Sequence, residues 1–171
     1  QEGGWGGSGG LFDVILPPGR NDFIFDAVNE GKTPNPAGLL VSVLDENNKI
    51  LFSTGDSGWK YSTTFKNVYT LGKLGIGPWK GAPGFKNQKA KWIWYTKNAN
   101  ISAPGSVNVS FKYTWNNSSS SNISSKISII VDNKASIFVN GKNIGEQEGG
   151  WGGSGGLFDV ILPPGRNDFI F

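Results

Sequence analysis

Apolar and polar residues alternate with a period of two along several short segments of this chain. Residues 107–115 are the clearest case, because Val, Phe, Tyr and Trp alternate there with Asn, Ser, Lys and Thr. Within residues 22–28, Phe23, Phe25 and Ala27 fall on one face. Successive side chains of a strand point to opposite faces, so this period predicts β-strands. The other predicted strands are residues 11–16, 39–44, 50–53, 91–95, 127–131 and 135–139.

Turn-forming residues separate these strands. Residues 45–49 form the turn of a predicted hairpin, and Asp132-Asn133 is predicted to turn the chain between two apolar runs. Asn140-Gly141 is a strong tight-turn signal, because both residues tolerate positive φ. The predicted loops are the Gly-rich residues 3–10 and 149–156 and the Ser-rich residues 116–125. No window shows a helical apolar stripe, so we predict little helix. Many short strands at about ten-residue spacing predict an all-β, antiparallel β-sandwich or jelly roll.

A long exact repeat is the most informative feature of the chain. Residues 1–25 and residues 147–171 are identical, at an offset of 146 residues. Either the chain is a window on a tandem array of 146-residue units, or a terminal segment has been duplicated. We therefore divide it into a first copy (1–25), the remainder of one β-sandwich unit (26–146) and a second copy that starts the next period (147–171).

The repeat predicts assembly between units. Each copy contains two predicted strands joined by a turn, and a fold built from one unit has one place for them. A spare copy would expose apolar strand edges, which recruit other chains. We therefore predict a linear assembly with copies of itself or adjacent repeats. The residues predicted to carry it are Leu11, Phe12, Val14, Ile15, Phe23, Phe25, Leu157, Phe158, Val160, Ile161, Phe169 and Phe171.

Composition narrows the function classes. The chain has no Cys, His or Met. Disulfides, serine–histidine triads, Cys/His zinc sites and His- or Cys-ligated haem are therefore excluded. Carboxylates such as Asp13, Asp22, Asp26 and Asp45 show no pairing pattern for glycoside hydrolysis, so we predict that the chain is not an enzyme. Apolar runs such as residues 39–41 are too short to cross a bilayer, and we predict no membrane insertion.

Charge is distributed unevenly. Residues 57–131 carry ten Lys and no acid, whereas the flanking residues 1–56 and 132–171 sum to −5 and −2. A polyanion surface is one interpretation. The lysines are well spaced and no Arg accompanies them, which favours a solvated face that protects strand edges, and we predict no nucleic-acid partner. Opposite charges on one chain would also suit head-to-tail association.

Four tryptophans are candidates for glycan binding, the alternative function. Trp5, Trp79 and Trp151 lie in Gly/Pro-rich segments and Trp59 follows Ser57-Gly58, so their rings are expected to be exposed. Flat exposed rings stack on pyranose faces. The competing interpretation, which we favour, is that all four are packing residues.

Metal binding and modification are weaker candidates. No cofactor is expected, although the oxygen-rich residues Asp22, Asp26, Asn29, Glu30, Asp45 and Glu46 leave a structural calcium open. No D-x-[DN]-x-[DN]-G loop is present. Five Asn-x-Ser sequons would be N-glycosylated if the protein were made in a secretory compartment. They start at Asn100, Asn108, Asn116, Asn117 and Asn122.

One arrangement of motifs resembles a known family. Residues 129–141 read IIVDNKASIFVNG, residues 160–167 read VILPPGRN, and the order continues through the repeat with residues 26–29 and 36–40. This arrangement resembles the galactose-binding-like β-sandwich family over most of the 146-residue unit. The resemblance implies a jelly roll, often a carbohydrate-binding or adhesive module of an extracellular, cell-surface or virion-surface protein. We therefore predict a structural repeat unit of a surface filament or adhesin.

Overall fold

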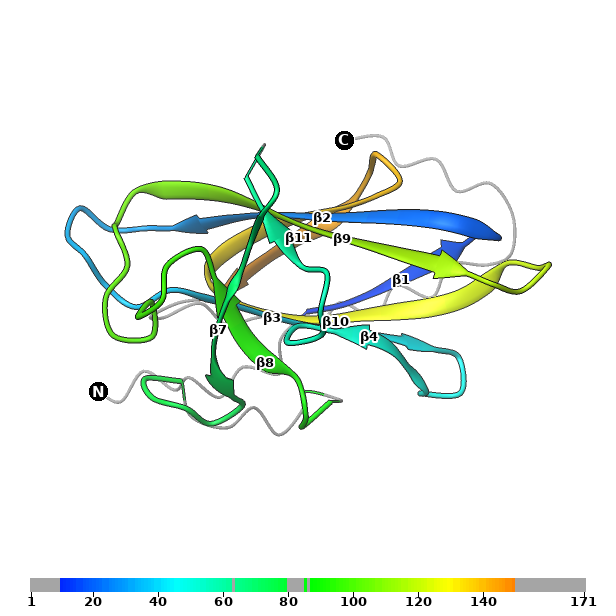
Figure 1. Ribbon diagram of the computed structural model, residues 1–171, viewed down its shortest axis with the longest axis horizontal. Helices are drawn as coiled ribbons and strands as arrows, with labels where there is room; N and C mark the ends of the chain where they lie inside the picture. The colour runs from blue at the N-terminus through cyan, green and yellow to red at the C-terminus, as the bar shows by residue number, and fades with distance from the viewer. Residues whose placement is uncertain (1–9, 63, 80–84, 86, 150–171) are drawn as a thin grey trace.

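The computed structural model describes residues 10–149 except 63, 80–84 and 86. It contains eleven strands and no helix in that part of the chain, which confirms the all-β antiparallel prediction (Figure 1). The strands are β1 (Gly10–Leu16), β2 (Gly19–Asn29), β3 (Gly38–Asp45), β4 (Ile50–Ser53), β5 (Lys60–Tyr61), β6 (Lys66–Asn67), β7 (Tyr69–Lys73), β8 (Lys91–Trp94), β9 (Val107–Asn117), β10 (Ile123–Val139) and β11 (Lys142–Gly149).

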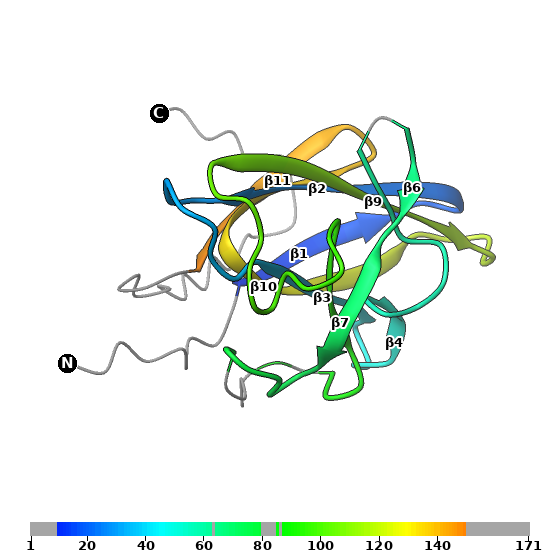
Figure 2. The same cartoon turned by 60° about the vertical axis from the view of Figure 1, so that its left-hand side comes forward.

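The long strand β10 connects two layers. Its first half pairs antiparallel with β1 and β3, and its second half pairs antiparallel with β2 and β11. Figures 1 and 2 show it curving from one layer into the other. The main path of the sheet runs β6-β5-β9-β2-β10-β3-β8-β7, so the sheet curls around a shared interior. Both layers therefore depend on one strand.

The main core lies between the two layers. Odd-numbered residues of β10, such as Ile127, Ile129 and Ile137, are buried in both halves of the strand, so one face of it points inward throughout. A smaller cluster forms around Trp79 and Trp92, whose rings stack with centroids 4.2 Å apart. Aromatic pairs of this kind add packing energy beyond the area they bury.

The local predictions succeed where the apolar alternation is strong. Every predicted strand lies within or closely overlaps an observed strand, the hairpin of β3 and β4 is present, and Asn140-Gly141 forms a turn with positive φ at both residues. The predicted turn at Asp132-Asn133 is wrong. Both residues lie within β10, because Asp132 pairs with Gly38 and Asn133 pairs with Gly149. Strand pairing there overrides the local turn preference.

Two polar segments contain more strand than the sequence predicts. The predicted loop at 116–125 is shortened to residues 118–122, because β9 runs to Asn117 and β10 starts at Ile123. Residues 142–149, which have few apolar side chains, form β11. These strands are stabilised by pairing with a long apolar neighbour rather than by an alternating pattern of their own.

Candidate functional site

The first copy of the repeat is an integral part of the fold. We define the slot as the place that residues 10–25 occupy, bounded by β9 and β10. In the slot, β1 pairs with residues 123–129 of β10, and β2 pairs with β9 and with residues 134–139 of β10. Figure 1 shows the blue strands β1 and β2 in different layers. The duplicated segment therefore contributes to both layers.

Apolar side chains of the segment complete the core. Leu16, Phe23 and Phe25 are fully buried and Val14 is nearly so. Phe23 packs edge-on against Phe52 with ring centroids 4.8 Å apart. Complete burial of one such side chain stabilises a fold by about 1.5–3 kcal/mol. An empty slot would therefore leave the core open, and any segment that fills it must supply these side chains.

The slot also recognises the polar groups of the segment. Asn117 Nδ2 donates to the Leu16 carbonyl at 3.1 Å. The Asp22 amide donates to Asn140 Oδ1 at 2.9 Å, and the Asn140 amide donates back to the Asp22 carbonyl at 2.8 Å. Asn140 Nδ2 also donates to Asn21 Oδ1. These bonds fix the register of the segment as well as its position.

Asp22 is the charged anchor of the segment. Its carboxylate accepts a hydrogen bond from Thr114 Oγ1 at 2.6 Å and pairs with Arg20 at 3.1 Å and Lys112 at 3.7 Å. The Thr114 bond, followed by the bond from Arg20 and the two cations, lowers the pKa of Asp22 below its ordinary value against the opposing effect of partial burial. The side chain is therefore held as a carboxylate at neutral pH.

The edge strand β1 presents apolar side chains to solvent. Among the described residues it pairs with β10 alone, so its other edge carries no ladder. Leu11 is 43% exposed and Ile15 is 56% exposed, on the face opposite to the buried Val14 and Leu16. Phe12 turns inward, close to Gly145 of β11. Exposed apolar residues on an unpaired edge favour docking of another strand.

The second copy begins in β11. Gln147 and Glu148 pair with Ala135 and Lys134, and Gly149 lies opposite Asn133. The remaining predicted assembly residues of this copy lie outside the described residues: Leu157, Phe158, Val160, Ile161, Phe169 and Phe171. β11 thus leads directly from the second half of β10 into the second copy.

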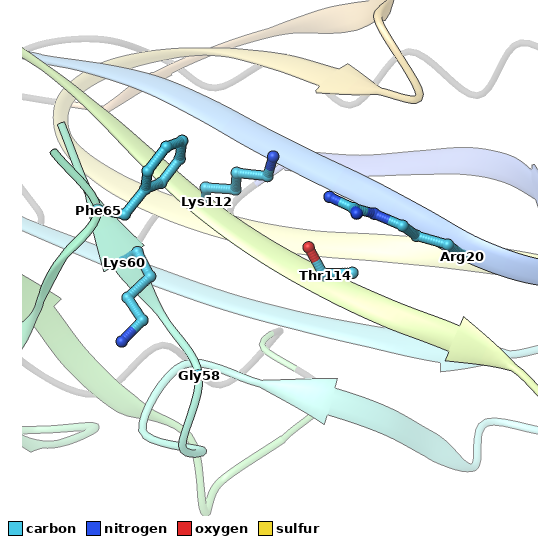
Figure 3. A pocket seen from close by; sticks show the side chains of 6 residues that line it. All are labelled: Arg20, Gly58, Lys60, Phe65, Lys112 and Thr114. Carbon is cyan, nitrogen blue, oxygen red and sulfur yellow. The ribbon is translucent and has the colours of Figure 1, made fainter. Parts of the chain in front are cut away.

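A separate hollow lies on the outer face of β9. It has a volume of about 450 Å³ and is lined by Arg20, Gly58, Lys60, Phe65, Lys112 and Thr114 (Figure 3). The Phe65 ring is 54% exposed, and Lys112 Nζ lies 5.4 Å from its centre. Lys60 donates to Asn67. The hollow combines three cations with one accessible aromatic ring.

The prediction of exposed tryptophan rings is wrong for Trp59 and Trp79. Each is 2% exposed, and each indole N–H has an internal acceptor. Trp59 Nε1 donates to the Ser53 carbonyl at 2.9 Å, and Trp79 Nε1 donates to Asp132 Oδ2 at 3.0 Å. These rings cannot stack on a sugar in this fold. Trp5 and Trp151 lie outside the described residues.

The sequons differ in access. Asn108, Asn116 and Asn122 are exposed and Asn100 is half-buried. Asn117 is 2% exposed and its amide nitrogen donates to the Leu16 and Ser121 carbonyls, so the folded protein buries this sequon.

Across residues 10–149, with the gaps given above, no three acidic side chains gather in a way that could hold a metal ion. The same part of the chain contains no helix suited to crossing a membrane.

Comparison with protein-family models, curated proteins and solved structures finds no match to this chain. The galactose-binding-like resemblance therefore stays a prediction. Sequence reasoning found the duplicated strands but missed their polar anchors, Asn117, Asn140 and Thr114, and the hollow. Those residues are far from the segment in sequence, and no local pattern indicates their partners.

Proposed function

We propose that the chain is a structural repeat unit that joins its neighbours through the slot. In this assembly, residues 156–171 of one unit displace residues 10–25 from the slot of the next unit and take their place as β1 and the first part of β2. The observation that carries the proposal is that the duplicated segment is a core-completing element, with Leu16, Phe23 and Phe25 fully buried. The proposed location, an extracellular, cell-surface or virion-surface filament or adhesin, is carried over from the family resemblance.

Two further features support pairing between units. Among the described residues β1 pairs with β10 alone, so a donated strand has one ladder to displace. β11 leads from the body of the fold into the second copy, so the donor leaves one unit beside its own slot. Binding by strand donation uses the same backbone pairing and side-chain burial as folding. No enzymatic step is part of the proposal.

Deletion of the donor tests the proposal. We expect the full chain, concentrated after purification, to form oligomers whose mass rises with concentration in light scattering and whose electron micrographs show a regular axial step. A chain of residues 1–149, which keeps the eleven strands described above, should stay monomeric. Equal assembly of both chains would contradict donation by the second copy, as would a full chain that stays monomeric at every concentration.

A full-length variant serves as the matched control. Leu162→Asp places a charge at the counterpart of Leu16, which is fully buried in the slot. Burial of an unpaired carboxylate is costly. The variant should therefore behave like residues 1–149 while its first copy, and hence its own fold, is untouched.

The hollow favours a second candidate function, the binding of an acidic saccharide. Arg20, Lys60 and Lys112 outnumber the one carboxylate, Asp22, that pairs with two of them. This excess of positive charge beside the exposed Phe65 ring suits a sugar that carries carboxylate or sulfate groups. This replaces the tryptophan version of the glycan hypothesis.

Ligand titration tests the hollow. A sulfated oligosaccharide should bind in low salt and a neutral one should not, and Lys60→Ala with Phe65→Ala should abolish binding. Lys126→Ala, which removes an exposed lysine from the part of β10 that pairs with β3 in the other layer, should leave it intact. Binding that survives the double substitution would exclude this site.

A further inference from the structure

The slot has two candidate occupants within one chain. Residues 1–25 and 147–171 are identical, so residues 156–171 carry every side chain that residues 10–25 place in the slot. The bonds from Asn117 and Asn140 and the packing around Phe23 do not distinguish between the copies. Any preference must come from how each copy is attached to the rest of the chain.

The second copy starts within reach of the slot of its own molecule. β11 pairs as far as Gly149, opposite Asn133, and β1 begins at Gly10, opposite Ile129. The side chain of Gln147 already lies against Gly10. The four steps along β10 from Ile129 to Asn133 span about 13 Å, whereas the seven steps from Gly149 to Gly156, the counterpart of Gly10, extend to roughly 23 Å.

We propose that the two copies exchange in one slot within a single molecule. In the N-terminal frame residues 10–25 fill the slot, as in the structure. In the C-terminal frame residues 156–171 fill it and residues 1–25 are released. The inference rests on the slot of the proposed function, but it needs no assembly, because donor and slot belong to the same chain.

The junction of the C-terminal frame falls inside β2. The identity ends at Phe25 and Phe171, so β2 would be built from residues 165–171 followed by residues 26–29. Asp26 faces outward, where Ser110 Oγ donates to its carboxylate, so the released segment can leave from the outer face. The N-terminal frame is favoured because its β2 is unbroken and no loop has to close. A change that weakens the first copy alone should reverse this preference.

Cleavage at the arginines of the chain can show which copy fills the slot. The only two arginines, Arg20 and Arg166, are counterparts in the two copies. Arg20 lies in β2, where it pairs with Asn116 of β9, and paired strands resist proteolysis. An arginine-specific protease should therefore cut the native wild-type protein after Arg166 and leave residues 1–166.

Matched substitutions reverse the cleavage. Phe23→Ala removes a fully buried ring from the first copy only, so the cut should move to Arg20 and leave residues 21–171. Phe169→Ala, the same change in the second copy, should leave the cut at Arg166. Cleavage through global unfolding would cut both sites, so a Phe23→Ala protein cut equally at both, or still cut at Arg166 alone, would overturn the proposal.

Thermal unfolding gives an independent readout. Phe169→Ala should leave the unfolding midpoint unchanged. Phe23→Ala should lower the midpoint by an amount set by the stability difference between the N-terminal and C-terminal frames. The double variant should lower it further, because neither copy then supplies the buried phenylalanine ring. Equal midpoints for Phe23→Ala and the double variant would overturn the exchange. All measurements use dilute, size-selected monomer, so failure of the full chain to assemble would count against the proposed function alone.

Discussion

At the scale of single residues, the buried carboxyl of Asp132 is the most unusual group. It is 2% exposed, and although Trp79 Nε1 donates to Oδ2, Oδ1 has no hydrogen-bond partner. Burial raises the pKa of Asp132 to about 6, against the lowering effect of the Trp79 bond. The ionised form is thus disfavoured where β10 passes between the layers.

This raised pKa predicts a stability that falls as pH rises. The folded pKa lies above the unfolded value of 3.8, so the stabilising contribution is complete below about pH 4 and is lost as pH rises through 6. The shift corresponds to about 3 kcal/mol at most. Urea unfolding from pH 4 to pH 7.5 should show this loss, and Asp132→Asn should flatten it. Glu46→Gln, on an exposed turn, should leave the slope unchanged; a slope that survives Asp132→Asn would contradict the assignment.

Asn117 provides a second test at this scale. Asn117→Ala removes donors to the Leu16 and Ser121 carbonyls, which leaves the buried Leu16 carbonyl unpaired and should cost about 1–3 kcal/mol of unfolding free energy. The adjacent Asn116→Ala, at an exposed position, should change stability by less than about 0.5 kcal/mol. Chemical denaturation of the two variants measures both. Equal effects would show that the buried bonds do not hold the segment.

At the scale of elements, the exposed face of β1 is the feature that bears on assembly. Leu11 and Ile15 project from an edge strand without contributing to the core. Donation replaces this strand in the acceptor, so substituting both residues by Lys should leave concentration-dependent growth in light scattering unchanged and should change stability by less than about 1 kcal/mol. Ile101→Lys, at a 72% exposed loop position, is the control and should also assemble normally. Loss of growth in the β1 variant alone would show that units join through this edge and not through the slot.

Elements with a strong alternating pattern could be predicted from the sequence. The buried residues Phe23, Phe25 and Phe111 followed from alternation alone. The strand β11 and the turn prediction at Asp132-Asn133 failed because pairing with distant residues decides both. Trp59 and Trp79 were predicted to be exposed because glycines lie near them in the sequence. Both are buried because the folded chain places the Ser53 carbonyl and the Asp132 carboxylate where they accept hydrogen bonds from the indole N–H groups.

At the scale of the whole molecule, the duplication predicted one place for two copies, and in the structure residues 10–25 occupy that place. Sequence identity alone showed that two copies compete for one place, but it could not show that this place spans both layers or that β11 ends beside it. Those facts depend on the register of β10 with β1 and β11. The slot is therefore best tested by substitutions that distinguish the two copies.

The pairing of β1 with β10 has a kinetic consequence. Gly10 pairs with Ile129 and Leu16 pairs with Ile123, so the earliest described strand has no partner until one of the latest has been made. Contacts of such long sequence separation slow folding, and all-β topologies of this kind fold in milliseconds to seconds. During synthesis, the first strand would leave the ribosome long before its template exists, whereas the second copy would emerge directly after that template. Folding during synthesis and refolding of the full chain would therefore begin at different ends of the same sequence.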